Sequence, residues 1–311
     1  MSVKKGINLP FVLKEFYAPT KMKLFLFLIR EMGLTQSDAQ RFIARGRVFK
    51  DDIAITNHSA DIEGHFKCIQ FEPISRGLEP IFQTDTFALF DKPSGVLVHP
   101  QNRATPYSMI DEIRYRFGAS SNIVHRIDQE TSGLLLASTD KASERKLKTL
   151  FENREVQKEY LALVHGRVKH DIEIDEPLLR EEDHSAIVRM VVKVDSCGKE
   201  SKTHIEPIAY YPDRDMTLVC AKPHTGRQHQ IRVHLFHVKH PIVGDPIYGQ
   251  RESDILRFLD RELDDQERIR LSGASRLMLH ANVLMFNINS TYYKLKSRSK
   301  FMERVVKIAS N

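Results

Sequence analysis

Apolar residues recur at helical spacing near the N-terminus of the chain, and this pattern predicts two helices in succession. The first is expected over residues 21–32, because its apolar side chains share one face and Gly33 follows. The second is expected between Thr35, whose hydroxyl can cap it, and Gly46. These helices begin a small module that we assign to residues 21–72.

Short runs of apolar residues after the two helices predict a small sheet. Residues 47–49 and 53–55 flank the polar turn 50–52, and residues 68–71 can add a third strand. The module is therefore expected to be α/β, with two helices followed by strands. Residues 1–20 are expected to form an N-terminal extension outside it.

From about residue 78 onward, β-rich segments alternate with turns that contain Gly, Pro and Asp. Residues 82–99 predict a hairpin, residues 140–154 an amphipathic helix, and residues 251–271 a helix on the surface. A helix after Thr225, capped by its hydroxyl, is also expected. Further strands are expected at residues 160–164, 186–194, 201–211, 216–222 and 276–286.

Composition places the chain among globular proteins, and its basic charge supports a polyanionic partner without deciding the question alone. Lys and Arg outnumber Asp and Glu by 47 to 41, which gives a formal charge of +6. The three cysteines, Cys68, Cys197 and Cys220, are far apart, so neither a disulfide framework nor a thiolate zinc site is indicated. No apolar run is long enough for a membrane span or a secretory signal, and we expect a cytoplasmic protein without membrane contact.

The segment HRIDQETSGLLLAS, residues 125–138, holds a carboxylate in a setting that suits a nucleophile. Asp128 follows Arg126 by two residues and precedes a polar turn and an apolar strand. Burial disfavours an ionised carboxylate, and a nearby cation offsets that cost. Taken alone, such a pair is more typical of a solvated surface salt bridge.

The same segment resembles the signature of the RluA-type pseudouridine synthases, which isomerise uridine in RNA. Other segments resemble further motifs of that family, namely residues 87–100, 158–166, 222–249 and 276–286. The resemblance implies an α+β fold for residues 80–311: a mixed, mainly antiparallel central sheet with flanking helices and a catalytic cleft. Residues 21–72 resemble the RNA-binding domain named after ribosomal protein S-four.

The resemblance implies roles for four residues. Asp128 is the expected catalytic nucleophile, and Arg232 the cation that pairs with it. The ring of Tyr160 is expected to stack on a flipped base. Arg126 either fills the gap that the extruded nucleotide leaves or holds its phosphate.

The implied reaction breaks the bond from ribose C1′ to N1 of uracil, turns the base, and joins C1′ to C5. No redox change occurs, so no cofactor is expected. Three routes are open to a carboxylate: attack at C6 of the base, attack at C1′, or removal of a proton in an elimination. Five histidines between residues 224 and 240 do not have the spacing of metal ligands, so no metal is expected.

The expected partner is RNA, most of all large-subunit ribosomal RNA, bound by a monomer. One alternative is the same activity on transfer RNA. A second is a non-catalytic RNA-binding or ribosome-assembly protein that keeps the fold for affinity. A third, a hydrolase of free uridine, fits poorly with the basic charge and the N-terminal module.

Overall fold

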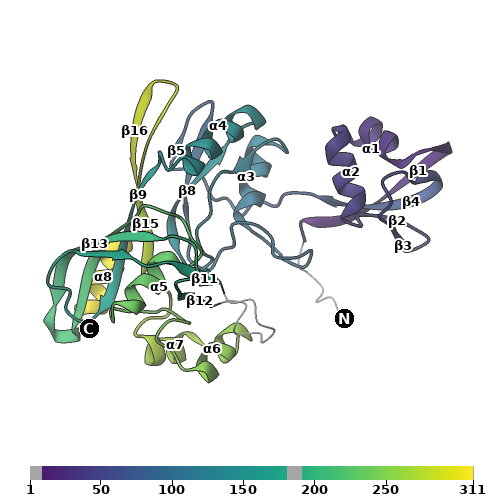
Figure 1. Cartoon of the computed structure of the whole chain (residues 1–311). Coiled ribbons are helices and arrows are strands. Elements are labelled where there is room, and N and C mark those ends of the chain that lie inside the picture. The colour runs from purple at the N-terminus through teal and green to yellow at the C-terminus, as the bar shows by residue number, and fades with distance from the viewer. Residues whose placement is uncertain (1–8, 181–190, 311) are drawn as a thin grey trace. The chain divides into compact units, whose positions relative to one another are not determined.

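The structure, a computed structural model, describes residues 9–180 and 191–310, and the chain divides into two compact units (Figure 1). The first unit runs to Arg76 and includes Pro100–Asp111. The second comprises Gly77–His99 and Glu112 onward. Among the described residues, no helix is both long and apolar enough to cross a bilayer.

The first unit is a four-stranded sheet with two helices packed on one face. The strand order is β1 (Phe11–Lys23), β4 (Asp61–Phe71), β2 (Val48–Lys50) and β3 (Ile53–Ile55), all antiparallel. The helices are α1 (Leu24–Met32) and α2 (Gln36–Ala44). Their buried side chains form one core with those of the sheet: Leu24, Phe27, Leu28, Ala39, Phe42, Ile43, Ile62 and Phe66.

The N-terminal boundary of this unit differs from the predicted one. Residues 11–20, assigned to an extension, lie in β1, which also takes residues 21–23 from the start of the predicted first helix. Pro19 and a register shift between Ala18 and Met22 interrupt the pairing with β4. Proline inside a strand weakens the sequence signal for it, which explains the error. The cap of the second helix is as predicted, since the Thr35 hydroxyl accepts the Asp38 N–H.

The second unit is built on a ten-stranded mixed sheet. One path of eight strands has the order β10 (Ile172–Asp175), β13 (Lys202–Tyr211), β14 (Met216–Pro223), β9 (Gln157–His165), β15 (Leu279–Ile288), β8 (Ser132–Ser138), β6 (Phe87–Lys92) and β5 (Phe82–Gln83). Two further strands lie off this path: β16 (Thr291–Lys296) pairs with β15, and β7 (Asn122–Ile123) pairs with β8. The hairpin of β15 and β16 projects beyond the sheet in Figure 1. The β15–β8 pairing is parallel and the others are antiparallel, so the predicted α+β fold with a mixed, mainly antiparallel sheet is confirmed.

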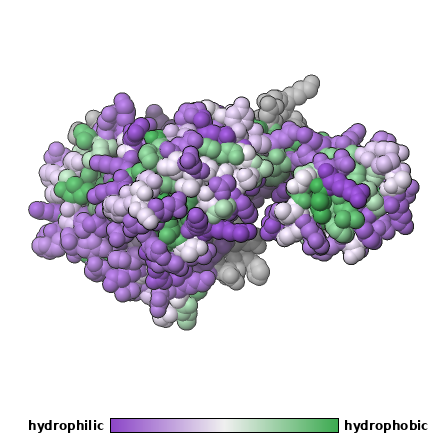
Figure 2. Space-filling view, turned by 90° about the horizontal axis from the view of Figure 1, so that it is seen from above, coloured by the Kyte–Doolittle hydropathy of each residue, from purple (hydrophilic) through white to green (hydrophobic). Residues whose placement is uncertain are grey.

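Helices and a small ribbon surround this sheet. The helices are α3 (Met109–Phe117), α4 (Lys141–Glu152), α5 (Gln230–His237), α6 (Glu252–Leu259), α7 (Asp265–Ser272) and α8 (Phe301–Ser310). A two-stranded ribbon joins β11 (Leu178–Arg180) to β12 (Val192–Val194). Side chains from β9, β14, α5 and α8 share one hydrophobic cluster, and those from β8, β15 and α4 share another. Hydrophilic side chains predominate on the face shown in Figure 2.

Two predicted elements of this unit take a different form. The predicted hairpin 82–99 has its strands at β5 and β6, while residues 96–99 form a loop. The predicted single helix 251–271 is two helices, α6 and α7, because Asp264 begins a new helix with a capping box that includes Glu267. The strand expected at 186–194 is described from residue 191 on, where β12 lies, and its earlier part falls outside the described residues.

Candidate active site

Asp128 lies in the loop before β8, where backbone packing fixes the chain closely. The Thr131 N–H donates to the Asp128 carbonyl at 3.2 Å and closes a turn. Two residues after Thr131, Gly133 has φ +106°, and a Cβ there would lie 2.2 Å from the Ala281 carbonyl oxygen. A glycine is therefore required where β8 meets β15, and this contact holds the start of β8 in place.

A buried lysine ties a second loop to the loop of Asp128. The side chain of Lys92 is 1% exposed, and its Nζ donates to the carbonyls of Pro93, Val96 and Gln129 at 2.9, 2.8 and 2.8 Å. Burial lowers the pKa of Lys92 to about 7, although Glu130 and Asp128 favour its charged form. Because Gln129 follows Asp128 directly, this lysine restrains the backbone beside the expected nucleophile.

The guanidinium of Arg232, on α5, lies between two carboxylates. Its Nη1 is 3.3 Å from Oδ2 of Asp128, while Nε and Nη2 donate to the two oxygens of Asp245 at 2.7 and 2.8 Å. Arg232 is 3% exposed and Asp245 is fully buried, whereas the side chain of Asp128 is 19% exposed. Burial alone would lower the pKa of Arg232, but Asp245 and Asp128 raise it above its ordinary value. Arg232 is thus a fixed cation that presents one N–H to Asp128.

A histidine and a tyrosine complete the surroundings of Asp128. Nε2 of His229 lies 3.8 Å from Oδ2 of Asp128, and its Nδ1 is 2.9 Å from the Tyr248 hydroxyl. That hydroxyl accepts the Val192 N–H at 3.0 Å, so it has its own proton to donate to Nδ1. Burial and Arg232 lower the pKa of His229 to about 4, so the ring is neutral near pH 7. The tautomer with the proton on Nε2 fits both neighbours.

Asp128 opens onto a pocket of about 900 Å³ in the second unit. Tyr160, on β9, lines this pocket, and burial together with Asp128 raises the pKa of its hydroxyl. Arg126 also lines the pocket, with an exposed side chain that forms no ion pair with Asp128. The structure therefore brings Asp128, Arg232 and Tyr160 together at one pocket. Arg126 lies at the same pocket, but the expected contact between its guanidinium and the Asp128 carboxylate is not formed.

Sequence reasoning missed three residues of this site and misplaced one helix cap. Asp245, His229 and Tyr248 were not predicted as site residues, although Asp245 and Tyr248 follow the helix in the string GDPIYG. The predicted cap at Thr225 is wrong, because α5 starts after His229, whose backbone is left-handed with φ 55°. The Thr225 hydroxyl instead donates to the Gln230 side chain and accepts the Lys202 N–H.

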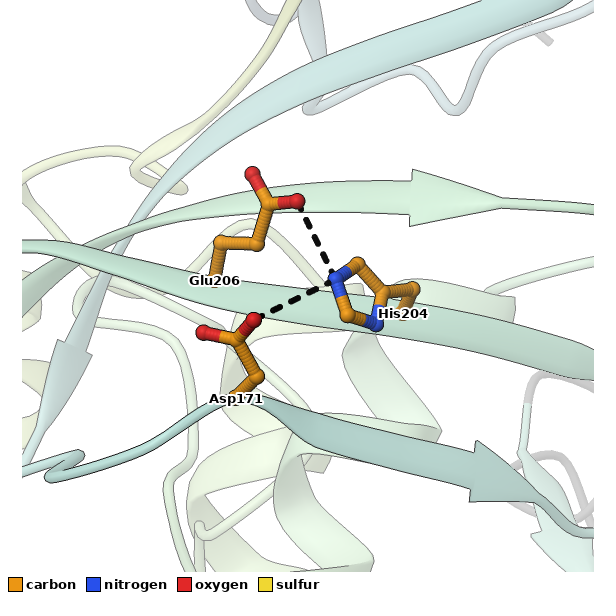
Figure 3. Close-up of side chains that lie close together, drawn as sticks. All are labelled: Asp171, His204 and Glu206. Carbon is orange, nitrogen blue, oxygen red and sulfur yellow. Dashed lines mark hydrogen bonds and ion pairs between the residues drawn. The ribbon is translucent and has the colours of Figure 1, made fainter.

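One group of potential metal ligands lies away from this pocket. Within the described part of the chain, Asp171, His204 and Glu206 are the group whose ligand atoms lie within 4.8 Å of one another (Figure 3). Glu206 already pairs with Lys222 at 2.5 Å. Its carboxylate thus has a cation partner, and we assign the group to a salt-bridge network on the sheet surface.

Comparisons with known proteins point to one family. Residues 86–237 match the family model described as RNA pseudouridylate synthase. An uncharacterized RNA pseudouridine synthase of Helicobacter pylori is 36% identical over 292 residues, which cover 93% of this chain and 94% of the relative. A human structure, RNA pseudouridylate synthase domain containing 1, superposes with a TM-score of 0.59 at 26% identity, covering 76% of this chain and 90% of that one.

Two further relatives carry more specific names. Ribosomal large subunit pseudouridine synthase C of Vibrio vulnificus is 33% identical over 234 residues, 74% of this chain and 68% of the relative. A tRNA pseudouridine synthase C of Yersinia pestis is 33% identical over 221 residues, 68% of this chain and 81% of the relative.

The fold and these matches define an enzyme of the isomerase class. The chain belongs to the RNA pseudouridine synthase family. The predicted family is thereby confirmed.

Proposed function

We propose that this protein converts specific uridines of large-subunit ribosomal RNA to pseudouridine, with Asp128 as the nucleophile. The observation that carries the proposal is the position of Asp128, which is partly exposed to the pocket and lies 3.3 Å from the buried guanidinium of Arg232. A carboxylate nucleophile must reach its substrate and needs a counter-charge, and this arrangement provides both.

The residues around Asp128 suit a reaction that needs no outside energy. The isomerisation breaks the C1′–N1 bond, forms a C1′–C5 bond, removes the proton from C5 and leaves one on N1. Arg232 compensates the charge of Asp128 before the attack, whichever of the three routes the carboxylate takes. Since its other N–H groups bind Asp245, Arg232 keeps its position as the charge on Asp128 changes.

Tyr160 and Arg126 are assigned to the substrate. The target uridine must leave its stack before a side chain can reach it, which costs a few kcal/mol. Stacking on Tyr160 and contact of the exposed Arg126 with the RNA offset that cost. Both residues line the pocket of Asp128, which supports these roles.

We assign the first unit to RNA binding, on its resemblance to the S-four domain and on two exposed arginines, Arg30 on α1 and Arg45 at the C-terminal cap of α2. We expect a monomer that works in the cytoplasm. The free cysteines Cys68, Cys197 and Cys220 agree with a reducing compartment.

Ribosomal RNA is preferred as the substrate because the Vibrio vulnificus relative is named for the large ribosomal subunit. Transfer RNA is the second candidate, and the Yersinia pestis relative favours it. The test is to map pseudouridine in ribosomal and transfer RNA from cells with and without the gene. Sites lost from large-subunit RNA support the proposal, whereas sites lost from transfer RNA alone replace it with the second candidate. An unchanged map in both RNAs supports a non-catalytic role.

A further inference from the structure

Beside Tyr160, the pocket wall carries a lysine to which no role has been assigned. Lys158 precedes Tyr160 by two residues on β9, so both side chains lie on the same face of the strand, about 6.6 Å apart along it. Lys158 is partly buried and lines the pocket, and its Nζ donates to the Thr225 carbonyl at 3.1 Å. An ammonium group has three donors, so this contact leaves two for a ligand.

A second cation lies close to Lys158, at the end of α4. Arg154 also lines the pocket, and its positive charge acts on Lys158. Its backbone is left-handed, with φ 62°, two residues after α4 ends. The fold thus brings two like charges to one wall of the pocket, which raises the energy of the empty site.

Neither cation has a carboxylate partner. Within residues 9–180 and 191–310, no carboxylate lies within ion-pair distance of Lys158 or Arg154. Of the two carboxylates that line the pocket, Asp128 faces Arg232, and Glu152 is exposed. The partly buried Lys158, which has no carboxylate partner and has the exposed Arg154 beside it, is a site for an anion.

Among the described residues that line the pocket, the other ionisable groups add no negative charge near Lys158. His125, from the loop before β8, is neutral, because burial and Lys158 lower its pKa to about 3. Arg126 from the same loop, and His224 and Arg227 from the loop before α5, complete the ionisable lining on these elements. Burial and Arg154 lower the pKa of Lys158 itself to about 8.

We propose that Lys158, together with Arg154, binds a phosphate of the RNA backbone next to the uridine that stacks on Tyr160. This inference rests on the proposed function, because it takes Tyr160 as the site of the base. The separation of Lys158 from Tyr160 is on the scale of one nucleotide step. A bound phosphodiester, with its single negative charge, supplies the missing counter-ion and favours the protonated lysine, so RNA binding takes up a proton near pH 8.

The test compares RNA affinity at several pH values for wild type, Lys158→Arg and Lys158→Met. The probe is a large-subunit ribosomal RNA fragment that wild type modifies, and the range is pH 6.5 to 8.8. Wild-type affinity should fall about fivefold between pH 7 and 8.8, as the free lysine loses its proton. Lys158→Arg should bind at pH 7 like wild type and lose this dependence, because arginine stays charged. Exposed lysines titrate near 10.4 and do not contribute in this range. Lys92, whose pKa is about 7, is present in all three proteins, so the difference between wild type and Lys158→Arg reports on Lys158.

Lys158→Met should bind about tenfold more weakly at pH 7 and lower the slope of log affinity against log salt by about 0.7. Lys307→Met, at an exposed position of α8 outside the pocket, is the matched control and should behave as wild type. Circular dichroism of each variant checks that it is folded. A Lys158→Arg variant with the wild-type pH dependence, or a folded Lys158→Met variant with wild-type affinity, would overturn the phosphate site.

Turnover separates this proposal from the proposed function. If wild type binds and modifies the RNA while the Lys158 variants bind as wild type does, the phosphate site alone is wrong. If the Lys158 variants show the expected binding but Asp128→Asn retains turnover, the assignment of Asp128 is wrong and the phosphate site stands. Absence of RNA binding by wild type contradicts both.

Discussion

Replacement of Asp245 by asparagine should destabilise the protein through the charge of Arg232. Asparagine keeps an oxygen for the N–H groups of Ile247 and Tyr248, which Oδ1 accepts at 2.9 and 3.0 Å. The change therefore removes the negative charge and replaces Oδ2, which accepts the Arg232 Nε–H at 2.7 Å, by an NH2 group that cannot accept it. The guanidinium of Arg232 stays buried, with Asp128 as its remaining carboxylate neighbour at 3.3 Å.

Loss of one partner from a buried ion pair costs about 3–5 kcal/mol. We expect Asp245→Asn to lie near the lower end, about 3 kcal/mol, because Asp128 compensates part of the charge. Pseudouridine formation should also fall at least tenfold, as Arg232 is no longer held from its far side. Urea unfolding followed by circular dichroism measures the first effect, and modification of a ribosomal RNA fragment measures the second.

A double-mutant cycle shows whether the loss comes from the pair. Arg232→Met added to Asp245→Asn should cost less than Arg232→Met alone, with a coupling energy of about 2–3 kcal/mol. Glu303→Gln is the matched control, since Glu303 pairs with Lys300 at the surface, where both side chains are more than half exposed, and it should cost less than about 1 kcal/mol. An Asp245→Asn protein within 1 kcal/mol of wild type would refute the reasoning.

Three further predictions concern the rest of the molecule. Gly133→Ala should prevent stable folding of the second unit, because its Cβ would lie 2.2 Å from a backbone atom. Gly118→Ala is the control, since Gly118 has φ 83° and open space around it. It should lower the free energy of unfolding by about 1–2 kcal/mol, measured by thermal or urea unfolding. Burial lowers the pKa of His280 to about 4, so between pH 6.5 and 4 the unfolded chain takes up a proton that the folded chain does not. The free energy of unfolding should therefore fall as the pH falls through this range. His280→Gln should reduce the slope of the free energy of unfolding against pH by about 1.4 kcal/mol per pH unit. Replacement of Arg30 and Arg45 by glutamine should lower the salt slope of RNA binding by about 1.4, at 0.7 for each phosphate contact, and an unchanged slope would remove these two residues from the RNA contact surface.

Local patterns predicted most elements of this fold because one side of each was clearly apolar. The helix from Thr35 and the strand that holds Tyr160 are examples, since their caps and alternation are encoded within a few residues. β1 was missed because Pro19 and a register shift break its pattern. This strand is stabilised by its pairing with β4, about fifty residues later. A pattern read over a few neighbouring residues cannot show that pairing.

The candidate site shows the same division. Asp128, Tyr160 and Arg232 were found through family motifs, each within one short segment. Asp245 belongs to the site because both of its oxygens bind Arg232, which lies thirteen residues earlier. His229 belongs to it because its left-handed backbone precedes α5. Neither feature can be read from a short stretch of sequence. Lys158 lies in the same motif as Tyr160. That it has no carboxylate partner among the described residues follows only from the three-dimensional lining of the pocket.

Asp128→Asn tests the central claim most directly, since it keeps the size and one oxygen of the side chain and removes the nucleophilic carboxylate. The measurement is pseudouridine formation in a large-subunit ribosomal RNA fragment that wild type modifies, alongside the affinity for the same RNA. We predict no detectable pseudouridine and an affinity close to that of wild type. Turnover by a folded Asp128→Asn protein that contains no wild-type enzyme would contradict the assignment of Asp128 as nucleophile.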